Sequence, residues 1–204
     1  MDRCTVRPTY YFSGIAIALL VTLLSACGPT MKPFVSGNLQ GGEDSKLAIL
    51  PFDNLSSTPG AAKVMENLVL IEFLKRSTVR IVDPGEVSAA LSKERIRLAS
   101  SLSRESIRAL GTALGVRFLA MGTVHQFEVQ TSGGAGGQTP AVGLALRIID
   151  AGTGEIVWAG TAARRGNDRE IVFGIGKIHS LNALGEETAE EFARAFAEAL
   201  GKEK

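Results

Sequence analysis

The chain has 204 residues, of which 45% are hydrophobic and 21% charged, and its 22 Lys and Arg nearly balance 21 Asp and Glu. This is the composition of an ordinary globular protein of one domain, or two at most, and it argues against intrinsic disorder. A formal net charge of +1 gives no electrostatic basis for binding nucleic acid, while two cysteines and two histidines argue against a disulfide framework and a zinc site.

The N-terminus has the pattern of a lipoprotein signal peptide. A segment with two arginines precedes an apolar run at residues 12–24, which is shorter than the roughly 20 residues that a membrane-spanning helix needs. The run ends in Leu-Ser-Ala-Cys, which resembles the lipobox of bacterial lipoproteins, where the cysteine thiol receives a diacylglycerol before cleavage in front of it. We predict cleavage between Ala26 and Cys27 and lipid attachment at Cys27; the alternative is a core helix with an incidental cysteine.

This processing would leave no free thiol, because Cys4 is removed with the signal peptide and Cys27 carries the lipid. By resemblance to lipoprotein sorting rules, Gly28 after the cysteine favours the outer membrane, with the protein on its periplasmic face. The region up to residue 45 is rich in Gly, Pro, Ser and Asn and predicts a flexible tether. We therefore expect a signal peptide at 1–26, the lipidated cysteine and tether at 27–45, and a folded domain at 46–204.

Residues 46–52 predict a strand, 53–57 a turn, and about 60–76 a helix. One helix face should be buried: Val64, Met65, Leu68, Val69 and Ile71. The opposite face should be polar: Lys63, Glu66 and Asn67. Near the C-terminal end of the helix, this opposite side becomes apolar, because it carries Leu70, Phe73 and Leu74. Either a neighbouring helix or a partner must cover these three residues. A neighbouring helix is the favoured interpretation, and Leu70, Phe73 and Leu74 are the candidate partner surface.

The next segments predict a strand at 78–82 and two helices. Asp83 followed by Pro and Gly-Glu has the form of a helix start, and a second helix should begin near Ser103 and end at Gly115. Residues 116–130 then predict a long strand that is apolar on both sides, which is typical of a central strand.

The C-terminal third predicts a β-hairpin, with strands at 142–148 and 155–163, and a final helix at about 186–200. The residues of this helix expected to pack on the sheet are Ala189, Phe192, Ala193 and Phe196. The loops at 133–137 and 164–181 remain candidates for membrane or partner contact. The predicted order is β-α-β-α-α-β-β-β-α, an α/β (α+β) fold with a mixed sheet in a single domain.

Three sequence features together carry a family resemblance: LAILPFDNLS at 47–56, RIIDAGTGEIVWAG at 147–160, and the lipobox. They resemble the CsgG/LpoB-type periplasmic lipoproteins, related in fold to the N-terminal domain of TolB and to PelC, over residues 46–200. The resemblance implies a non-catalytic module of secretion or envelope assembly. The curli channel of this family inserts two long amphipathic hairpins, but the intervals 129–141 and 164–181 are too short to supply pairs of membrane strands of about 9–11 residues. A smaller ring or a monomeric docking module is therefore expected.

No residue pattern indicates catalysis. His125 and His179 are far apart in sequence, no serine lies in a Gly-x-Ser-x-Gly motif, and the Gly-Ile-Gly-Lys sequence at 174–177 lacks the spacing of a phosphate-binding loop. Arg164, Arg165 and Arg169 indicate either a charged docking loop or, as the favoured interpretation, a solvated one. Trp158 is expected in the core. We predict no enzyme, no cofactor and no metal.

Three hypotheses for the function remain. Copies of the chain form a ring that serves an exporter; or a monomer docks on and activates an envelope (peptidoglycan) synthase; or the protein binds a small ligand in the periplasm. The expected partners are the outer membrane, through the N-terminal lipid, and other envelope proteins or further copies of the chain, with no nucleic acid.

Overall fold

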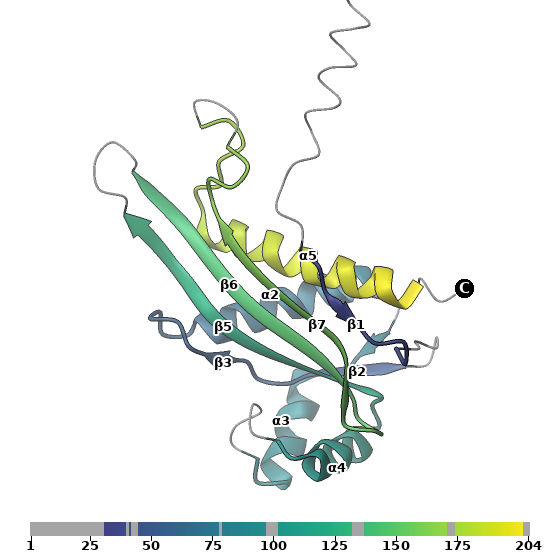
Figure 1. The fold of residues 1–204 in the computed structure, drawn as a ribbon. Helices are drawn as coiled ribbons and strands as arrows, with labels where there is room; N and C mark the ends of the chain where they lie inside the picture. The colour runs from purple at the N-terminus through teal and green to yellow at the C-terminus, as the bar shows by residue number, and fades with distance from the viewer. Residues whose placement is uncertain are drawn as a thin grey trace, which may run out of the picture. The chain divides into compact units, whose positions relative to one another are not determined.

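The alternating apolar residues of the second half of the chain form a long β-hairpin at the centre of a mixed sheet, as the computed structural model shows (Figure 1). Strand β5 (Phe118–Thr131) pairs antiparallel with β6 (Gln138–Asp150), which pairs antiparallel with β7 (Glu155–Arg165). The structure describes residues 31–39, 41, 45–77, 79–96, 102–131, 137–170 and 174–201. Ala26, Cys27 and most of the glycine-rich turn at 133–137 lie outside these ranges, so the predictions made for them stay predictions.

Four short strands complete a seven-stranded sheet in the order β1-β7-β6-β5-β2-β4, with β3 also paired to β5. Their bounds are β1 (Phe34–Val35), β2 (Lys46–Ile49), β3 (Asp53–Asn54) and β4 (Arg80–Ile81). β2, β3 and β4 pair in parallel, whereas β1 pairs antiparallel with β7. The predicted mixed sheet and the central place of the 116–130 strand are confirmed. β1 and β3 were not predicted, because two residues show no periodicity and Asp-Asn is typical of a turn.

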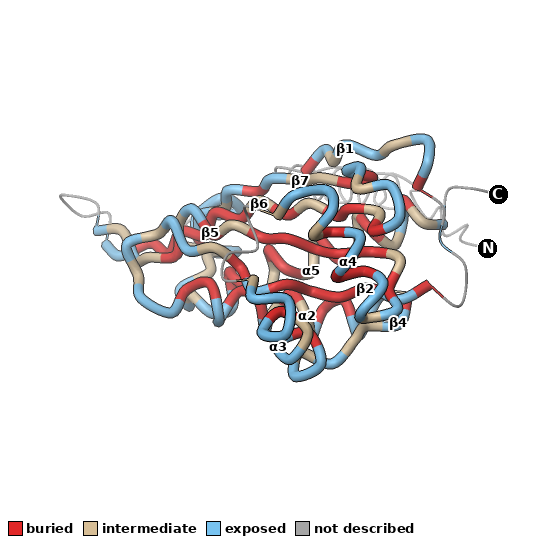
Figure 2. The backbone as a smooth tube through the Cα atoms, turned by 90° about the horizontal axis from the view of Figure 1, so that it is seen from below, coloured by how far each residue is buried: buried red, intermediate tan, exposed pale blue. Residues whose placement is uncertain are grey.

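The helices form a layer on each face of the sheet. Their bounds are α2 (Ala61–Arg76), α3 (Pro84–Lys93), α4 (Arg104–Leu114) and α5 (Leu181–Gly201). α2 and α5 pack on one face over the larger core, and α3 and α4 pack on the other over a smaller core at the start of β5 and the end of β6. Figure 2 shows the buried residues concentrated along the middle of the strands, with exposed residues toward the tip of the β5–β6 hairpin.

The local signals at the helix ends act as predicted. The Asp83 carboxylate accepts a hydrogen bond from the Gly85 N–H at 2.7 Å, and the Ser103 hydroxyl accepts one from Ser106 N–H at 3.1 Å. Gly115 ends α4 with φ of 61°, a left-handed conformation that glycine adopts without strain. These caps fix where α3 and α4 begin and end on the sheet.

An aromatic cluster joins α5 to α2 and the sheet. The Phe196 ring lies 5.7 Å from Phe73, 6.3 Å from Phe118 and 5.9 Å from Trp158, measured between ring centroids. Phe192 adds an edge contact to Trp158 at 6.0 Å. Trp158 is fully buried, which confirms its predicted place in the core, and its Nε1–H finds no partner among the described residues.

The predicted buried face of α2 is partly wrong. Met65 and Val69 are buried as expected, but Val64 and Ile71 are exposed, and two glutamates take inward positions instead. The buried residues at helical spacing are Ala61, Ala62, Met65, Glu66, Val69, Glu72 and Phe73. The periodicity misled because apolar residues lie on both sides of this helix, so the pattern did not identify which side meets the sheet.

The folded part begins earlier than the predicted boundary at residue 46. Residues 31–201 belong to one compact unit, in which Met31 and Leu39 are buried in the core. Phe34 lies opposite Ala159 of β7 and Val35 opposite Trp158, so β1 is an edge strand of the sheet. Most of the predicted tether is therefore part of the domain. α5 also begins before its predicted start, at Leu181.

Candidate functional site

The two histidines lie on different parts of the described fold. His125 and His179 are both exposed, the first on β5 beside an irregularity in its pairing with β6 and the second just before α5. Within the described ranges, no group of three or more His, Cys, Asp and Glu residues is placed to hold a metal ion. The helices in these ranges are all too short or too polar to cross a membrane. The features that stand out are surfaces.

An apolar stripe runs along the outer side of α2, opposite its buried face. We define the α2 stripe as Val64, Ile71 and Leu74, whose exposed fractions are 38%, 45% and 60%. Their spacing of seven and three residues places them along one side of the helix. Within one copy of the chain, they are among the large apolar side chains left in contact with water.

The candidate partner surface predicted from the sequence is divided by α5. Phe73 is fully buried against Phe196 and is no part of an outer surface, because its side of α2 faces α5. Leu70 is half-buried against the core, and Leu74 is exposed. The favoured expectation of a covering helix therefore holds for Phe73, whereas Leu74 is exposed in a single copy of the chain.

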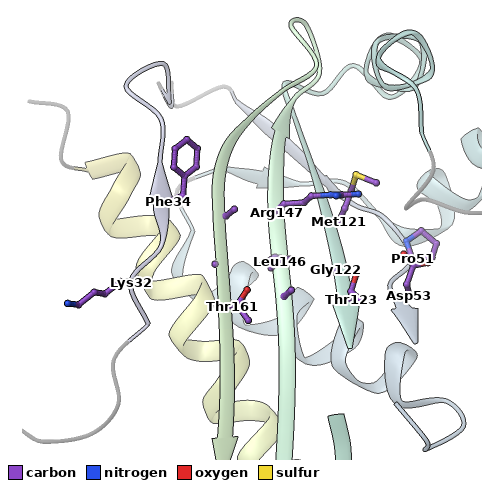
Figure 3. A pocket seen from close by; sticks show the side chains of 13 residues that line it. Lys32, Phe34, Pro51, Asp53, Met121, Gly122, Thr123, Leu146, Arg147 and Thr161 are labelled. Carbon is purple, nitrogen blue, oxygen red and sulfur yellow. The ribbon is translucent and has the colours of Figure 1, made fainter. Parts of the chain in front are cut away.

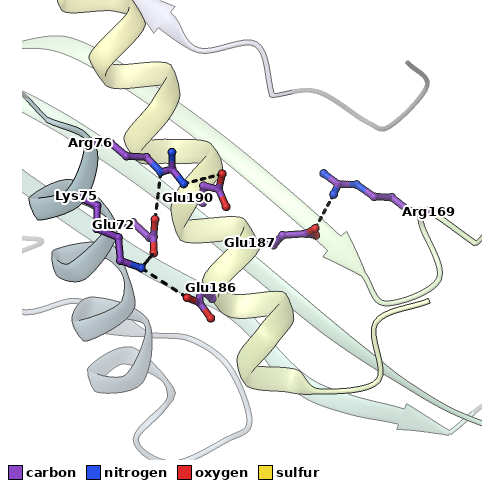
Figure 4. Close-up of polar contacts among 7 residues, drawn as sticks. All are labelled: Glu72, Lys75, Arg76, Arg169, Glu186, Glu187 and Glu190. Atoms are coloured by element: carbon purple, nitrogen blue, oxygen red, sulfur yellow. Dashed lines mark hydrogen bonds and ion pairs between the residues drawn. The ribbon is translucent and has the colours of Figure 1, made fainter. Parts of the chain in front are cut away.

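Ion pairs join α2 to α5 around the buried carboxylate of Glu72 (Figure 4). Lys75 Nζ lies 2.6 Å from Glu72 and 3.7 Å from Glu186, and Arg76 Nη2 lies 2.9 Å from Glu190. Arg76 Nε also contacts Glu72 at 3.2 Å. Burial acts to raise the pKa of the Glu72 carboxyl, but the hydrogen bonds and charges of Lys75 and Arg76 outweigh it and hold this pKa below its usual range.

Because the pKa of Glu72 is lowered in the folded state, its contribution to stability is present above the unfolded-state pKa and is lost as the pH falls through the folded-state pKa. We expect Glu72→Gln to lower the free energy of unfolding by about 1–2 kcal/mol near neutral pH. Urea unfolding should show this difference between parent and variant shrinking as the pH is lowered below the ordinary pKa of a glutamate, about 4.3. Glu198→Gln, an exposed site on α5, is the control and should change little at either pH. A difference for Glu72→Gln that stays constant with pH would contradict the ionic role.

A groove lies on the part of the sheet that α3 and α4 leave uncovered (Figure 3). It has a volume of about 420 Å³, and β7, β6 and β5 form its floor. Phe34 and Lys32 border it on the β1 side, and Pro51, Asp53 and Met121 on the other. The sequence did not reveal this groove, because its residues come from five segments that only the sheet brings together.

A largely buried ion pair fixes the start of the folded part. The Met31 backbone N–H donates to Glu191 Oε1 at 2.7 Å, and the Glu191 carboxylate is held by Arg164 through Nε at 3.0 Å and Nη2 at 2.6 Å. Both side chains are 14% exposed. Arg164 is thus part of the β7 framework and not of a docking loop, and Arg169 pairs with Glu187 of α5 at 2.5 Å (Figure 4).

Comparisons with known proteins agree with this architecture. The family model for CsgG, described as the curli production assembly/transport component CsgG, matches residues 69–201. A search of curated proteins found no match.

Among solved structures, the chain is similar to a variant of the PelC dodecamer from Paraburkholderia phytofirmans. That match has 17% identity and a TM-score of 0.57, and covers 83% of this chain and 99% of that chain. Lipoprotein GNA1162 from Neisseria meningitidis matches with 16% identity and a TM-score of 0.53 over 73% of this chain and 98% of that chain. At these identities the likeness shows the fold, which agrees with the resemblance found in the sequence. Since the CsgG model matches more than half of its residues, the chain belongs to the CsgG family.

Proposed function

We propose that this chain is a lipid-anchored, non-catalytic component of an envelope export assembly, built from several copies of the chain. The family description names an assembly and transport component, and the similar PelC structure is a dodecamer. The observation that carries the proposal is the α2 stripe: three exposed apolar side chains on the outer side of a helix, opposite the side that the domain itself buries. Such a surface is stabilised when another molecule covers it.

The proposed contact is head-to-tail, because a two-fold contact joins only two copies, whereas a ring needs one surface of each copy to meet a different surface of the next. The α2 stripe lies on the face of the domain covered by α2 and α5, and a contact between this stripe and a different surface of the next copy repeats around an axis. Repeated contacts of this kind close into a ring when the rotation between neighbours divides a full turn. A ring of copies encloses a central opening, whereas the alternative, a monomeric docking module, needs no such repetition.

If copies associate through the α2 stripe, charged substitutions in the stripe should lower the mass of the protein particle in solution from that of a multimer to that of a monomer. The lipidated protein extracted in detergent should give a multimer in light scattering after size-exclusion chromatography, and the double variant Ile71→Glu and Leu74→Glu should give a monomer, because a buried charge opposes the contact. Val129→Glu, which places the same charge at an exposed site on β5, is the control and should leave the multimer intact. A monomeric parent at all concentrations would overturn self-assembly and favour the monomeric activator instead.

Anchoring is tested at the lipidation site. We expect Cys27→Ser to abolish labelling by a palmitate analogue and to leave the signal peptide uncleaved, because the lipid is added to this thiol before cleavage. Cys4→Ser is the matched control and should leave labelling and cleavage unchanged, since that residue is removed with the signal peptide. Persistent labelling of the Cys27→Ser protein would refute the lipobox interpretation.

A further inference from the structure

The chain enters the folded domain at a fixed point. The Met31 side chain is buried in the core, and its backbone N–H is held by the Glu191 carboxylate, which in turn is held by Arg164. Arg164 donates through Nε to Glu191 Oε2 and through Nη2 to Oε1, a bidentate contact of the strong, charge-assisted kind. Residue 31 therefore cannot move away from α5 and β7 without breaking core contacts.

This fixed entry shortens the connection to the proposed lipid. Only three residues separate Cys27 from Met31. Four Cα–Cα steps span at most about 15 Å, whereas the tether predicted from the sequence, ending at residue 45, would span roughly 60 Å when extended. A diacylglycerol on Cys27 must therefore hold the surface around Met31 close to the lipid headgroups.

The surface beside this entry has the chemistry of a membrane interface. We define the β1 edge as residues 32–35, in which Lys32 is exposed, Phe34 is 57% exposed and Val35 is 44% exposed. β1 is the outermost strand on its side of the sheet, and none of the described residues forms a strand on its outer side. Aromatic and basic side chains are the residues that settle at headgroup depth, the ring among the upper acyl carbons and the cation at the phosphates.

We infer that the β1 edge rests on the phospholipid surface that carries the Cys27 lipid, with the Phe34 ring in the interfacial region and the Lys32 ammonium among the phosphates. The inference depends on the lipid attachment stated under the proposed function and adds an orientation to it. β7, β6 and β5 lie between β1 and β3 in the sheet. At about 4.8 Å per strand, the β3 side stands roughly 20 Å farther from the bilayer. The groove bordered by Phe34 then opens next to the membrane.

Quenching by brominated lipid tests this orientation in the full lipidated protein. Phe34→Trp and the matched control Leu55→Trp each place one tryptophan at an exposed apolar site, Leu55 lying just beyond β3. Both variants are reconstituted in phosphatidylcholine vesicles with and without brominated acyl chains. The signal of the buried Trp158, measured in the parent, is subtracted. Flotation of the vesicles reports anchoring independently.

We expect all three proteins to float and quenching to be several-fold greater at position 34 than at position 55. Flotation with equal quenching at the two positions, or with none at position 34, would overturn the orientation and leave the anchor in place. Loss of both flotation and lipid label in the parent would overturn the anchor, and the orientation with it.

Discussion

Replacing Phe196 by alanine will lower the free energy of unfolding by about 3–5 kcal/mol, because it removes a large buried side chain and leaves a cavity. Phe196 is fully buried on α5 and its ring contacts Phe73 of α2 and Phe118 of β5. No other ring of the described cluster contacts both α2 and β5. The cavity would separate α5 from both of its neighbours.

Urea unfolding followed by the fluorescence of Trp158, which lies 5.9 Å from the Phe196 ring, measures this loss directly. Phe34→Ala is the control, since that ring is exposed on β1 and its removal should cost less than about 1 kcal/mol. Equal losses for the two variants would show that α5 does not depend on the aromatic cluster.

Replacing Glu191 by alanine will remove about 3 kcal/mol, because it leaves the Arg164 guanidinium largely buried without its carboxylate. It also takes the acceptor from the Met31 N–H. The loss should be local as well as global: amide hydrogens in residues 33–39 should exchange faster with solvent, since the entry point of the chain is no longer held.

Hydrogen exchange read by mass spectrometry, together with urea unfolding, checks both parts. Glu187→Ala is the matched control on the same helix, because its partner Arg169 is well exposed and such surface pairs contribute less than about 1 kcal/mol. If residues 33–39 exchange at the parent rate in Glu191→Ala, β1 is held by its pairing to β7 alone.

The parts of the fold that sequence reasoning predicted are those with local physical causes. Asp83, Ser103 and Gly115 mark helix ends through contacts within a few residues, so their role could be predicted without any knowledge of the fold. The alternating strands of the hairpin are equally local in origin. The resemblance to the CsgG family, confirmed by the family model, then supplied the arrangement that local patterns cannot give.

The errors have causes that act across the chain. Glu72 is buried on a side of α2 that packs near α5. Its countercharges are Lys75 and Arg76 of α2, which also pair with Glu186 and Glu190 of α5, and the apolar periodicity of α2 gives no sign of this neighbouring helix. β1 forms by pairing with β7, and the backbone of Met31 is held by Glu191, 160 positions away. Composition alone made this segment look like a tether. The groove was not predicted because its lining residues come from separate segments that only the folded sheet brings together.

The lengths of the outermost strands have a consequence for how copies can meet. β1 and β4, at the two edges of the sheet, are two residues long each. Proteins held on one membrane surface meet at a far higher effective concentration than in solution, so a long open edge would invite uncontrolled pairing of backbones between copies. Two-residue edges offer almost no backbone template for such pairing. At β1 and β4, contacts between copies must then depend on side chains, so single substitutions there can adjust the strength of such contacts.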